Sequence, residues 1–204
     1  ARLPSFAFGL DTALRDLAGG GQRRLWDTPF RRGEAGLPAH GLIWMDTSAG
    51  LLDQVEAKVQ AGFRVIKMKV GALPFDEEIA LLAEIRRRYP PGTIELRLDA
   101  NGAFTPTEAP DQIAALAQFD IAMLEQPIGP GQWDSLAAIC RHTPIPIALD
   151  EELIAVADAA TRRELLDAVR PQQLVLKPAL LGGFGEAEDW IAEAEARVVT
   201  VNHS

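Results

Sequence analysis

The sequence contains little cysteine, tyrosine or histidine and no long apolar run. Its 204 residues include one cysteine (Cys140), one tyrosine and three histidines. A single cysteine excludes a disulfide framework within the chain and is typical of a reducing compartment, so we expect a cytoplasmic location. Because no apolar run reaches about 18 residues, we expect no membrane-spanning helix. The histidines lack metal-ligand spacing, so nothing indicates a zinc site built from them.

Basic residues are also scarce relative to acidic ones. The chain has 20 Lys and Arg against 29 Asp and Glu, a formal net charge of −9. This balance argues against nucleic acid or an anionic membrane as a partner. With 48% hydrophobic and 24% charged residues, the composition is that of a globular protein with one substantial core or two small ones. The sequence does not indicate an oligomeric state.

The sequence does contain a regular alternation of short apolar runs and helix-like segments. Segment 5–18 has helical apolar spacing and ends at three glycines, and segment 22–40 is loop-like. The predicted strands after it are 40–45, 64–70, 94–100, 121–126, 145–150, 173–178 and 197–201. The predicted helices are 49–62, 75–90, 106–119, 132–142, 159–169 and 184–196. This alternation predicts an α/β fold with a parallel sheet. Since a closed (β/α) barrel has eight strands, about seven predict an incomplete TIM-like barrel.

Charged residues end five successive apolar runs, at intervals of 25 to 30 residues. They are Lys69, Asp99, Glu125, Asp150 and Lys177. In parallel barrels the residues at the carboxyl ends of strands converge on one face, so we expect these side chains to share a site. One such carboxylate could simply cap the next helix. Three in succession favour a function.

The three carboxylates predict a metal site. Asp99, Glu125 and Asp150 are hard oxygen ligands without histidine or cysteine, a set that suits Mg²⁺, with Mn²⁺ as the second choice. Carboxylates brought close together repel one another, so we expect the ion to stabilise the site. Open coordination positions would accept water and a small anionic substrate.

The lysines predict acid-base groups beside this metal. Lys67 and Lys69 are two residues apart on one predicted strand and should face the same side. Two close ammonium groups lower each other's pKa, which suits a general base; a surface pair of extended lysines is the alternative. Lys177, on the sixth predicted strand, should lie across the barrel mouth from Lys69.

Four further residues are candidates for supporting the site. Asn101 follows Asp99 by two residues and could share its face or cap the next turn. Glu151 directly follows the third carboxylate and either supports it or lies in a loop. Gly182 and Gly183 precede a predicted helix, where they could form an anion-binding turn or a plain loop.

Together these motifs resemble the enolase superfamily. Its order and spacing are matched by K-x-K ending at Lys69, D-x-N from Asp99, E-Q-P from Glu125, D-E from Asp150 and L-K-P around Lys177. The longer strings IELRLDANGAF, EQPIGPGQW and LVLKPALLGGF resemble the o-succinylbenzoate synthase family of menaquinone biosynthesis. The resemblance covers roughly residues 5–200.

The resemblance implies a reaction. It implies Mg²⁺ held by the three carboxylates, and syn elimination of water from 2-succinyl-6-hydroxy-2,4-cyclohexadiene-1-carboxylate, through an enediolate, to give o-succinylbenzoate. It also implies that Lys69 removes the proton α to the carboxylate, that Lys177 stabilises the intermediate from the opposite face, and that Lys67 orients the carboxylate. An N-acylamino acid racemase or dipeptide epimerase of the same superfamily remains an alternative, as does a non-catalytic remnant.

The resemblance also implies how the chain is organised. Residues 1–21 would be the helix that leads into the barrel, and residues 22–204 a partial barrel that forms the catalytic domain. Family members carry an N-terminal capping domain and a last strand that have no counterpart here, and the chain starts at Ala1 rather than Met. We therefore expect an internal fragment or truncated product with little or no activity by itself.

Overall fold

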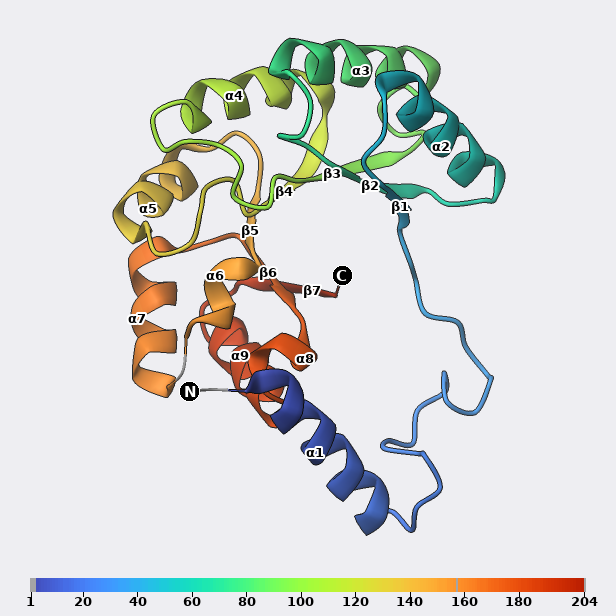
Figure 1. Ribbon diagram of the computed structural model, residues 1–204, viewed down its shortest axis with the longest axis vertical. Helices are drawn as coiled ribbons and strands as arrows, with labels where there is room; N and C mark the ends of the chain where they lie inside the picture. The colour runs from blue at the N-terminus through green and yellow to red at the C-terminus, as the bar shows by residue number, and fades with distance from the viewer. Residues whose placement is uncertain (1–2, 157, 204) are drawn as a thin grey trace. The chain divides into compact units, whose positions relative to one another are not determined.

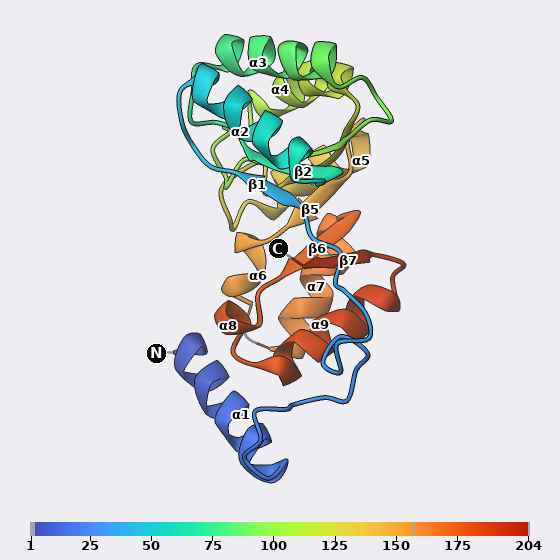
Figure 2. The same ribbon diagram turned by 90° about the vertical axis from the view of Figure 1, so that its right-hand side faces the viewer.

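The computed structural model describes residues 3–156 and 158–203, which form two compact units (Figures 1 and 2). One unit is Ala39–Leu174, and the other combines Ala1–Pro38 with Val175–Ser204. This division follows packing contacts. The boundary predicted from the sequence, after residue 21, separates a helix that leads into the barrel from the catalytic domain. That boundary stays a prediction.

The first unit is built on parallel strands. They are β1 (Gly41–Ile43), β2 (Val65–Lys69), β3 (Glu95–Asp99), β4 (Ile121–Glu125) and β5 (Ile147–Leu149), followed by the start of β6 (Gln173–Leu176). Each described neighbouring pair from β1 to β6 is parallel, and with β7 the sheet keeps sequence order. The α/β fold with seven strands in barrel-like order is therefore confirmed.

Helices connect these strands, and several of them cover the outer side of the sheet. They are α2 (Ser48–Gln60), α3 (Phe75–Arg88), α4 (Ala109–Leu116) with the 3₁₀ turn η1 (Ala117–Phe119), α5 (Trp133–His142), α6 (Glu151–Ile154) and α7 (Ala159–Val169). Figure 1 shows α2 to α5 along one side of β1 to β5. Local chemistry sets several ends: Thr47 accepts a hydrogen bond from Gly50 at the start of α2, and Asp158 caps α7 through Thr161.

The core of this unit lies between the sheet and those helices. Ile66 and Met68 on β2 are buried, as are Leu96 and Leu98 on β3. Lys67, between the two apolar residues of β2, is also buried and faces the opposite side of the strand. Both faces of β2 are therefore buried. Lys67 lies on the face opposite Ile66 and Met68, where the candidate site forms.

The second unit packs α1 (Pro4–Ala18) against α8 (Pro178–Leu181) and α9 (Phe184–Glu195), with β7 (Thr200–His203) beside α9. The Ser5 hydroxyl donates a hydrogen bond to the Ala179 carbonyl, 3.0 Å away. The Phe184 ring meets the rings of Phe8 and Trp26 edge-on, with centroids 5.1 and 4.7 Å apart. Contacts between residues more than 170 positions apart thus join the two ends of the chain in one unit.

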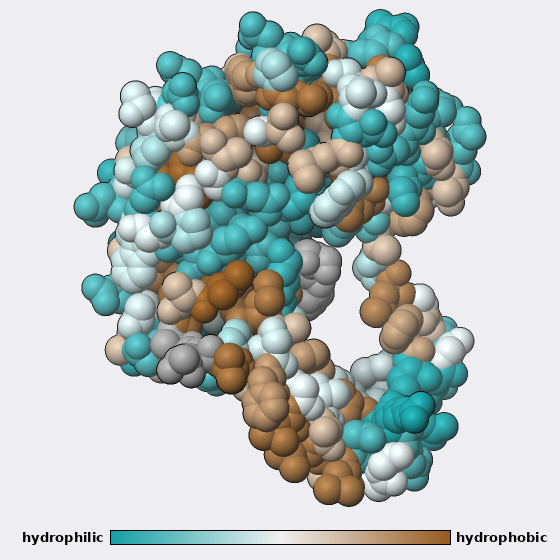
Figure 3. All heavy atoms as spheres, viewed as in Figure 1, coloured by the Kyte–Doolittle hydropathy of each residue, from teal (hydrophilic) through white to brown (hydrophobic). Residues whose placement is uncertain are grey.

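The exposed side of α1 is apolar. Figure 3 shows apolar side chains gathered along this helix. The exposed ones in and next to it are Leu3, Phe6, Leu10, Leu14 and Leu17. None of the described helices is long and apolar enough to cross a membrane.

Most predicted elements are present, with corrections at their ends. The predicted helix 106–119 begins at Ala109 and ends in the 3₁₀ turn, and the predicted strand 197–201 begins at Thr200. The short helices α6 and α8 were not predicted, because four residues do not display a helical period.

Candidate active site

Three functional candidates lie side by side at the carboxyl ends of neighbouring strands. In the strand register, Lys69 on β2 is paired with Asp99 on β3, and Asp99 is paired with Glu125 on β4. Asp150 follows the end of β5 and is the N-cap residue of α6. All three carboxylate residues are buried, each at most 2% exposed. The parallel register therefore produces the predicted convergence of these side chains.

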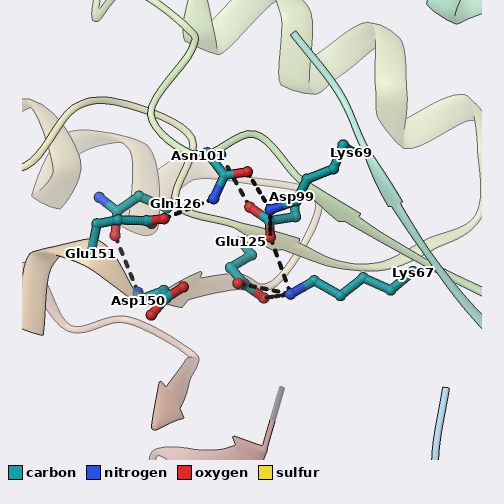
Figure 4. Close-up of polar contacts among 8 residues, drawn as sticks. All are labelled: Lys67, Lys69, Asp99, Asn101, Glu125, Gln126, Asp150 and Glu151. Atoms are coloured by element: carbon teal, nitrogen blue, oxygen red, sulfur yellow. Dashed lines mark hydrogen bonds and ion pairs between the residues drawn. The ribbon is translucent and has the colours of Figure 1, made fainter. Parts of the chain in front are cut away.

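Lys67 lies between two of the carboxylates (Figure 4). Its Nζ is 3.1 Å from Asp99 Oδ2, and 2.8 and 2.7 Å from the two oxygens of Glu125. The contact with Glu125 Oε1 has hydrogen-bond geometry. The Oε2 contact is an ion pair only, and within residues 3–156 and 158–203 this buried oxygen has no hydrogen-bond donor. The lysine thus supplies positive charge to a buried acidic pair.

Lys69 points to the same side of β2, as predicted. Its Nζ donates to Asp99 Oδ2 over 2.7 Å and to the side-chain oxygen of Asn101. The Asn101 amide nitrogen in turn donates to Glu151 Oε1 over 2.7 Å. The lysine side chain is 19% exposed, against 6% for Lys67. Lys69 is therefore the more accessible of the two amines. Asp99 and Asn101 hold its ammonium directly, and Glu151 in turn binds Asn101.

Together, burial and neighbouring charges raise the pKa of Glu125 but lower the pKa of Asp99. Burial raises the pKa of Glu125 to about 8, and repulsion from Asp99 and Asp150 adds to that increase, while Lys67 opposes it. Burial also acts to raise the pKa of Asp99, but its contacts with Lys69 and Lys67 outweigh burial and lower it. Glu125 therefore ionises less readily than Asp99.

These residues fit a divalent cation by their chemistry. Among the described residues, Glu125 Oε2 is buried and accepts no hydrogen bond, although the Lys67 ammonium lies 2.7 Å away. The pKa of this carboxyl group is raised, first by burial and then by its acidic neighbours, so a further cation would stabilise its ionised form. Oxygen ligands of this kind suit Mg²⁺ or Mn²⁺. Within residues 3–156 and 158–203, no three His, Cys, Asp or Glu side chains are gathered as a preformed metal cluster. The ammonium of Lys67 stands among the acids instead, so a metal would have to displace it.

Two residues outside the predicted set hold the strand ends together. Gln126 is fully buried, and its Oε1 accepts hydrogen bonds from the backbone nitrogens of Asp150 and Glu152. The buried Glu152 carboxylate accepts from the Gly131 nitrogen and the Trp133 indole. Gln126 is part of the E-Q-P motif, and Glu152 directly follows the D-E motif. Only their tertiary contacts show that these two side chains support the strand ends.

The remaining predicted residues belong to the second unit. Lys177 is the N-cap residue of α8, Gly182 follows α8, and Gly183 is the N-cap residue of α9. Both glycines have positive φ, 119° and 142°. The nitrogen of Phe184, at the start of α9, donates to Asp11 Oδ2 over 2.9 Å, so the protein's own carboxylate binds there. The proposed roles of Lys177 and the two glycines stay predictions.

Comparison with known proteins gives a family and several relatives. A family model described as "Enolase C-terminal domain-like" matches residues 50–204. An o-succinylbenzoate synthase from Desulfotalea psychrophila is 47% identical over 196 residues, which are 96% of this chain and 53% of that protein. An N-succinylamino acid racemase from Amycolatopsis is 34% identical over 143 residues, 70% of this chain and 37% of that protein.

Solved structures give the same relationships. The crystal structure of MenC from Desulfotalea psychrophila matches with a TM-score of 0.94 and 45% identity, covering 100% of this chain and 56% of that one. A dipeptide epimerase from Enterococcus faecalis matches with a TM-score of 0.83 and 25% identity, covering 100% and 58%. The chain spans about half the length of these relatives.

Proposed function

Because the chain belongs to the enolase C-terminal domain-like family, we propose that it carries the strand-end site of an o-succinylbenzoate synthase. The reaction is the Mg²⁺-dependent dehydration of 2-succinyl-6-hydroxy-2,4-cyclohexadiene-1-carboxylate. The observation that carries the proposal is the position of Lys69, an accessible amine beside buried carboxylates at the ends of successive parallel strands. The 47% identity to a protein named o-succinylbenzoate synthase supports this activity.

The proposed chemistry begins with proton removal by Lys69. In its neutral form, the Lys69 amine takes the proton α to the substrate carboxylate, and the C–H electron pair moves toward that carboxylate. The resulting ammonium then gives a proton to the departing hydroxyl, so that water leaves and the ring becomes aromatic. Contacts with Asp99 and Asn101 fix the direction of the amine, and orientation of this kind is a large part of general acid-base catalysis.

The other residues stabilise negative charge. Asp99, Glu125 and Asp150 would hold a divalent cation, which when bound supplies Lewis-acid stabilisation of the substrate carboxylate. Lys67, which lies beside Glu125 and Asp99 when no metal is bound, would help orient the substrate carboxylate. By resemblance alone we assign Lys177 as a second cation that stabilises the intermediate.

Racemisation or epimerisation is the second candidate function. It is favoured by the relatives named N-succinylamino acid racemase and hydrophobic dipeptide epimerase. In that reaction Lys69 and Lys177 would each exchange a proton with one face of the substrate. Both reactions begin with the same proton removal, so the first chemical step does not distinguish them.

The test follows turnover of the proposed substrate. We expect Mg²⁺-dependent formation of o-succinylbenzoate, followed by its ultraviolet absorbance, with little exchange of an N-succinylamino acid in deuterium oxide. Deuterium incorporation that requires both Lys69 and Lys177, without dehydration, would establish the second candidate instead. The isolated 204-residue chain is expected to be weakly active or inactive.

A further inference from the structure

Gln126 makes contacts that join the ends of three neighbouring strands. It directly follows Glu125 on β4 and is fully buried. Its backbone nitrogen donates to the Ala148 carbonyl on β5 over 2.9 Å, and its carbonyl accepts from the Gly102 nitrogen after β3 over 2.7 Å. The strands it connects are the ones that end in the three candidate carboxylates.

The side chain of Gln126 adds a second connection to the β5 end. Its Oε1 accepts from the Asp150 nitrogen over 3.1 Å (Figure 4). The same oxygen accepts from the Glu152 nitrogen over 3.2 Å. Its Nε2 donates to the Ile128 carbonyl over 2.9 Å, which fixes the orientation of the amide. The amide oxygen of Gln126 thus holds the backbone of Asp150 in a fixed position relative to Gln126, which directly follows Glu125.

The backbone of Gln126 shows that this geometry is imposed by its surroundings. Its φ is 39°, a left-handed value that non-glycine residues adopt infrequently. Such conformations persist where several contacts fix them, and here the backbone contacts on both sides do so. A shift of this residue would move the Glu125 carboxylate and the start of α6 together.

We propose that Gln126 is a positioning residue that sets the spacing of Glu125 and Asp150 for binding a divalent cation. The inference depends on the proposed function, because it assumes that these carboxylates bind the metal. Mg²⁺ requires near-ideal octahedral geometry, so its affinity is sensitive to small changes in ligand spacing. Residues that orient metal ligands typically contribute about 10- to 100-fold in metal affinity.

The opposite end of β5 offers a matched control. Gln172 also uses its Oε1 to accept from a backbone nitrogen, that of Ile147, over 2.9 Å. Its Nε2 donates to the Cys140 carbonyl over 3.0 Å. Replacing this glutamine removes a pair of side-chain hydrogen bonds from the same strand, but at the end remote from the carboxylates.

The test compares Mg²⁺ affinity and hydrogen exchange in Gln126→Met, Gln172→Met and the unsubstituted protein. Methionine keeps the approximate volume and removes the side-chain hydrogen bonds, three at Gln126 and two at Gln172. We expect Gln126→Met to bind Mg²⁺ about 10- to 100-fold more weakly by calorimetry. We also expect faster amide exchange at Asp150 and Glu152 without metal. Gln172→Met should lower the thermal midpoint but leave Mg²⁺ affinity within about twofold, because it does not contact the ligand-bearing ends.

The outcomes separate the inference from the proposed function. If the unsubstituted protein binds no Mg²⁺, the metal site is wrong and the inference is overturned with it. If it binds Mg²⁺ but Gln126→Met binds equally well, or Gln172→Met weakens binding as much, the positioning role alone is overturned. Should Gln126→Met not fold, Gln126→Asn decides the matter: its amide is one methylene shorter, so we expect weaker Mg²⁺ binding, and unchanged binding would contradict the inference.

Discussion

Lys67→Met is the substitution that most directly probes the charge balance of the site. Lys67 is 6% exposed and contacts Asp99 and Glu125, which are 1% and 0% exposed. Methionine fills a similar volume but leaves two buried acidic groups without their shared cation. Removing one partner of a buried ion pair typically costs about 3–5 kcal/mol, because the remaining charge stays buried. We expect a loss in that range for the metal-free protein.

Mg²⁺ should recover much of this loss, since it supplies positive charge to the same carboxylates. A ligand present at about 100 times its dissociation constant stabilises the folded state by roughly 2.7 kcal/mol. Because the lysine no longer competes for the acids, we expect Lys67→Met to bind Mg²⁺ at least as tightly as the unsubstituted protein. The measurement is urea denaturation at pH 7.5, in EDTA and in excess Mg²⁺.

The control for Lys67→Met is Lys58→Met. Lys58 lies on α2, with its ammonium 5.5 Å from the Phe63 ring centre, and contacts none of the acidic residues of the site. We expect a change below about 1 kcal/mol, the size of a cation–π contact, and no dependence on Mg²⁺. Equal stability of Lys67→Met and the unsubstituted protein in EDTA would refute the idea that this lysine balances buried charge.

Three further substitutions test other parts of the site. Lys69→Ala should lower turnover of the natural protein by at least about 10²- to 10⁴-fold, the usual contribution of a general base, with Mg²⁺ affinity largely kept; turnover within tenfold would exclude that role. Asp150→Asn should weaken Mg²⁺ binding in a calorimetric titration, and an unchanged isotherm would remove it from the ligand set. Glu78→Gln tests the loop after β2: burial raises the pKa of Glu78, although hydrogen bonds from the nitrogens of residues 71–73 oppose this. A raised pKa in the folded state means that stability is lost as pH rises above the unfolded value of 4.5, so the variant should gain on the unsubstituted protein as pH rises through that value in urea denaturation; a pH-independent difference would contradict the shift.

The strands and the convergence of their ends could be predicted from the sequence. Apolar runs that alternate with helical periods identify β2 to β6, and the intervals between Lys69, Asp99 and Glu125 place them at equivalent positions of successive strands. The parallel register then makes these residues direct neighbours. Both predictions depend on local patterns, which a sequence displays.

The partners of each side chain could not be predicted in this way. The spacing of Lys67 and Lys69 predicts two like charges on one face. It does not show that the Lys67 ammonium lies between Asp99 on β3 and Glu125 on β4, or that the Lys69 ammonium contacts Asp99 alone of the three carboxylates. Likewise, nothing local to Gln126 indicates that its amide binds backbone nitrogens 24 and 26 residues away. The packing of α1 on α8 depends on contacts between opposite ends of the chain, such as Ser5 with Ala179.

The central claim is that the carboxyl ends of the strands form one divalent-cation site. Calorimetric titration of Mg²⁺ into the purified chain, Glu125→Gln and Glu95→Gln tests it directly. Glu95 lies at the opposite end of β3, with its side chain 41% exposed. One Mg²⁺ bound per chain, lost in Glu125→Gln and kept in Glu95→Gln, is the predicted result. Absence of binding, or binding that both variants retain equally, would contradict the account.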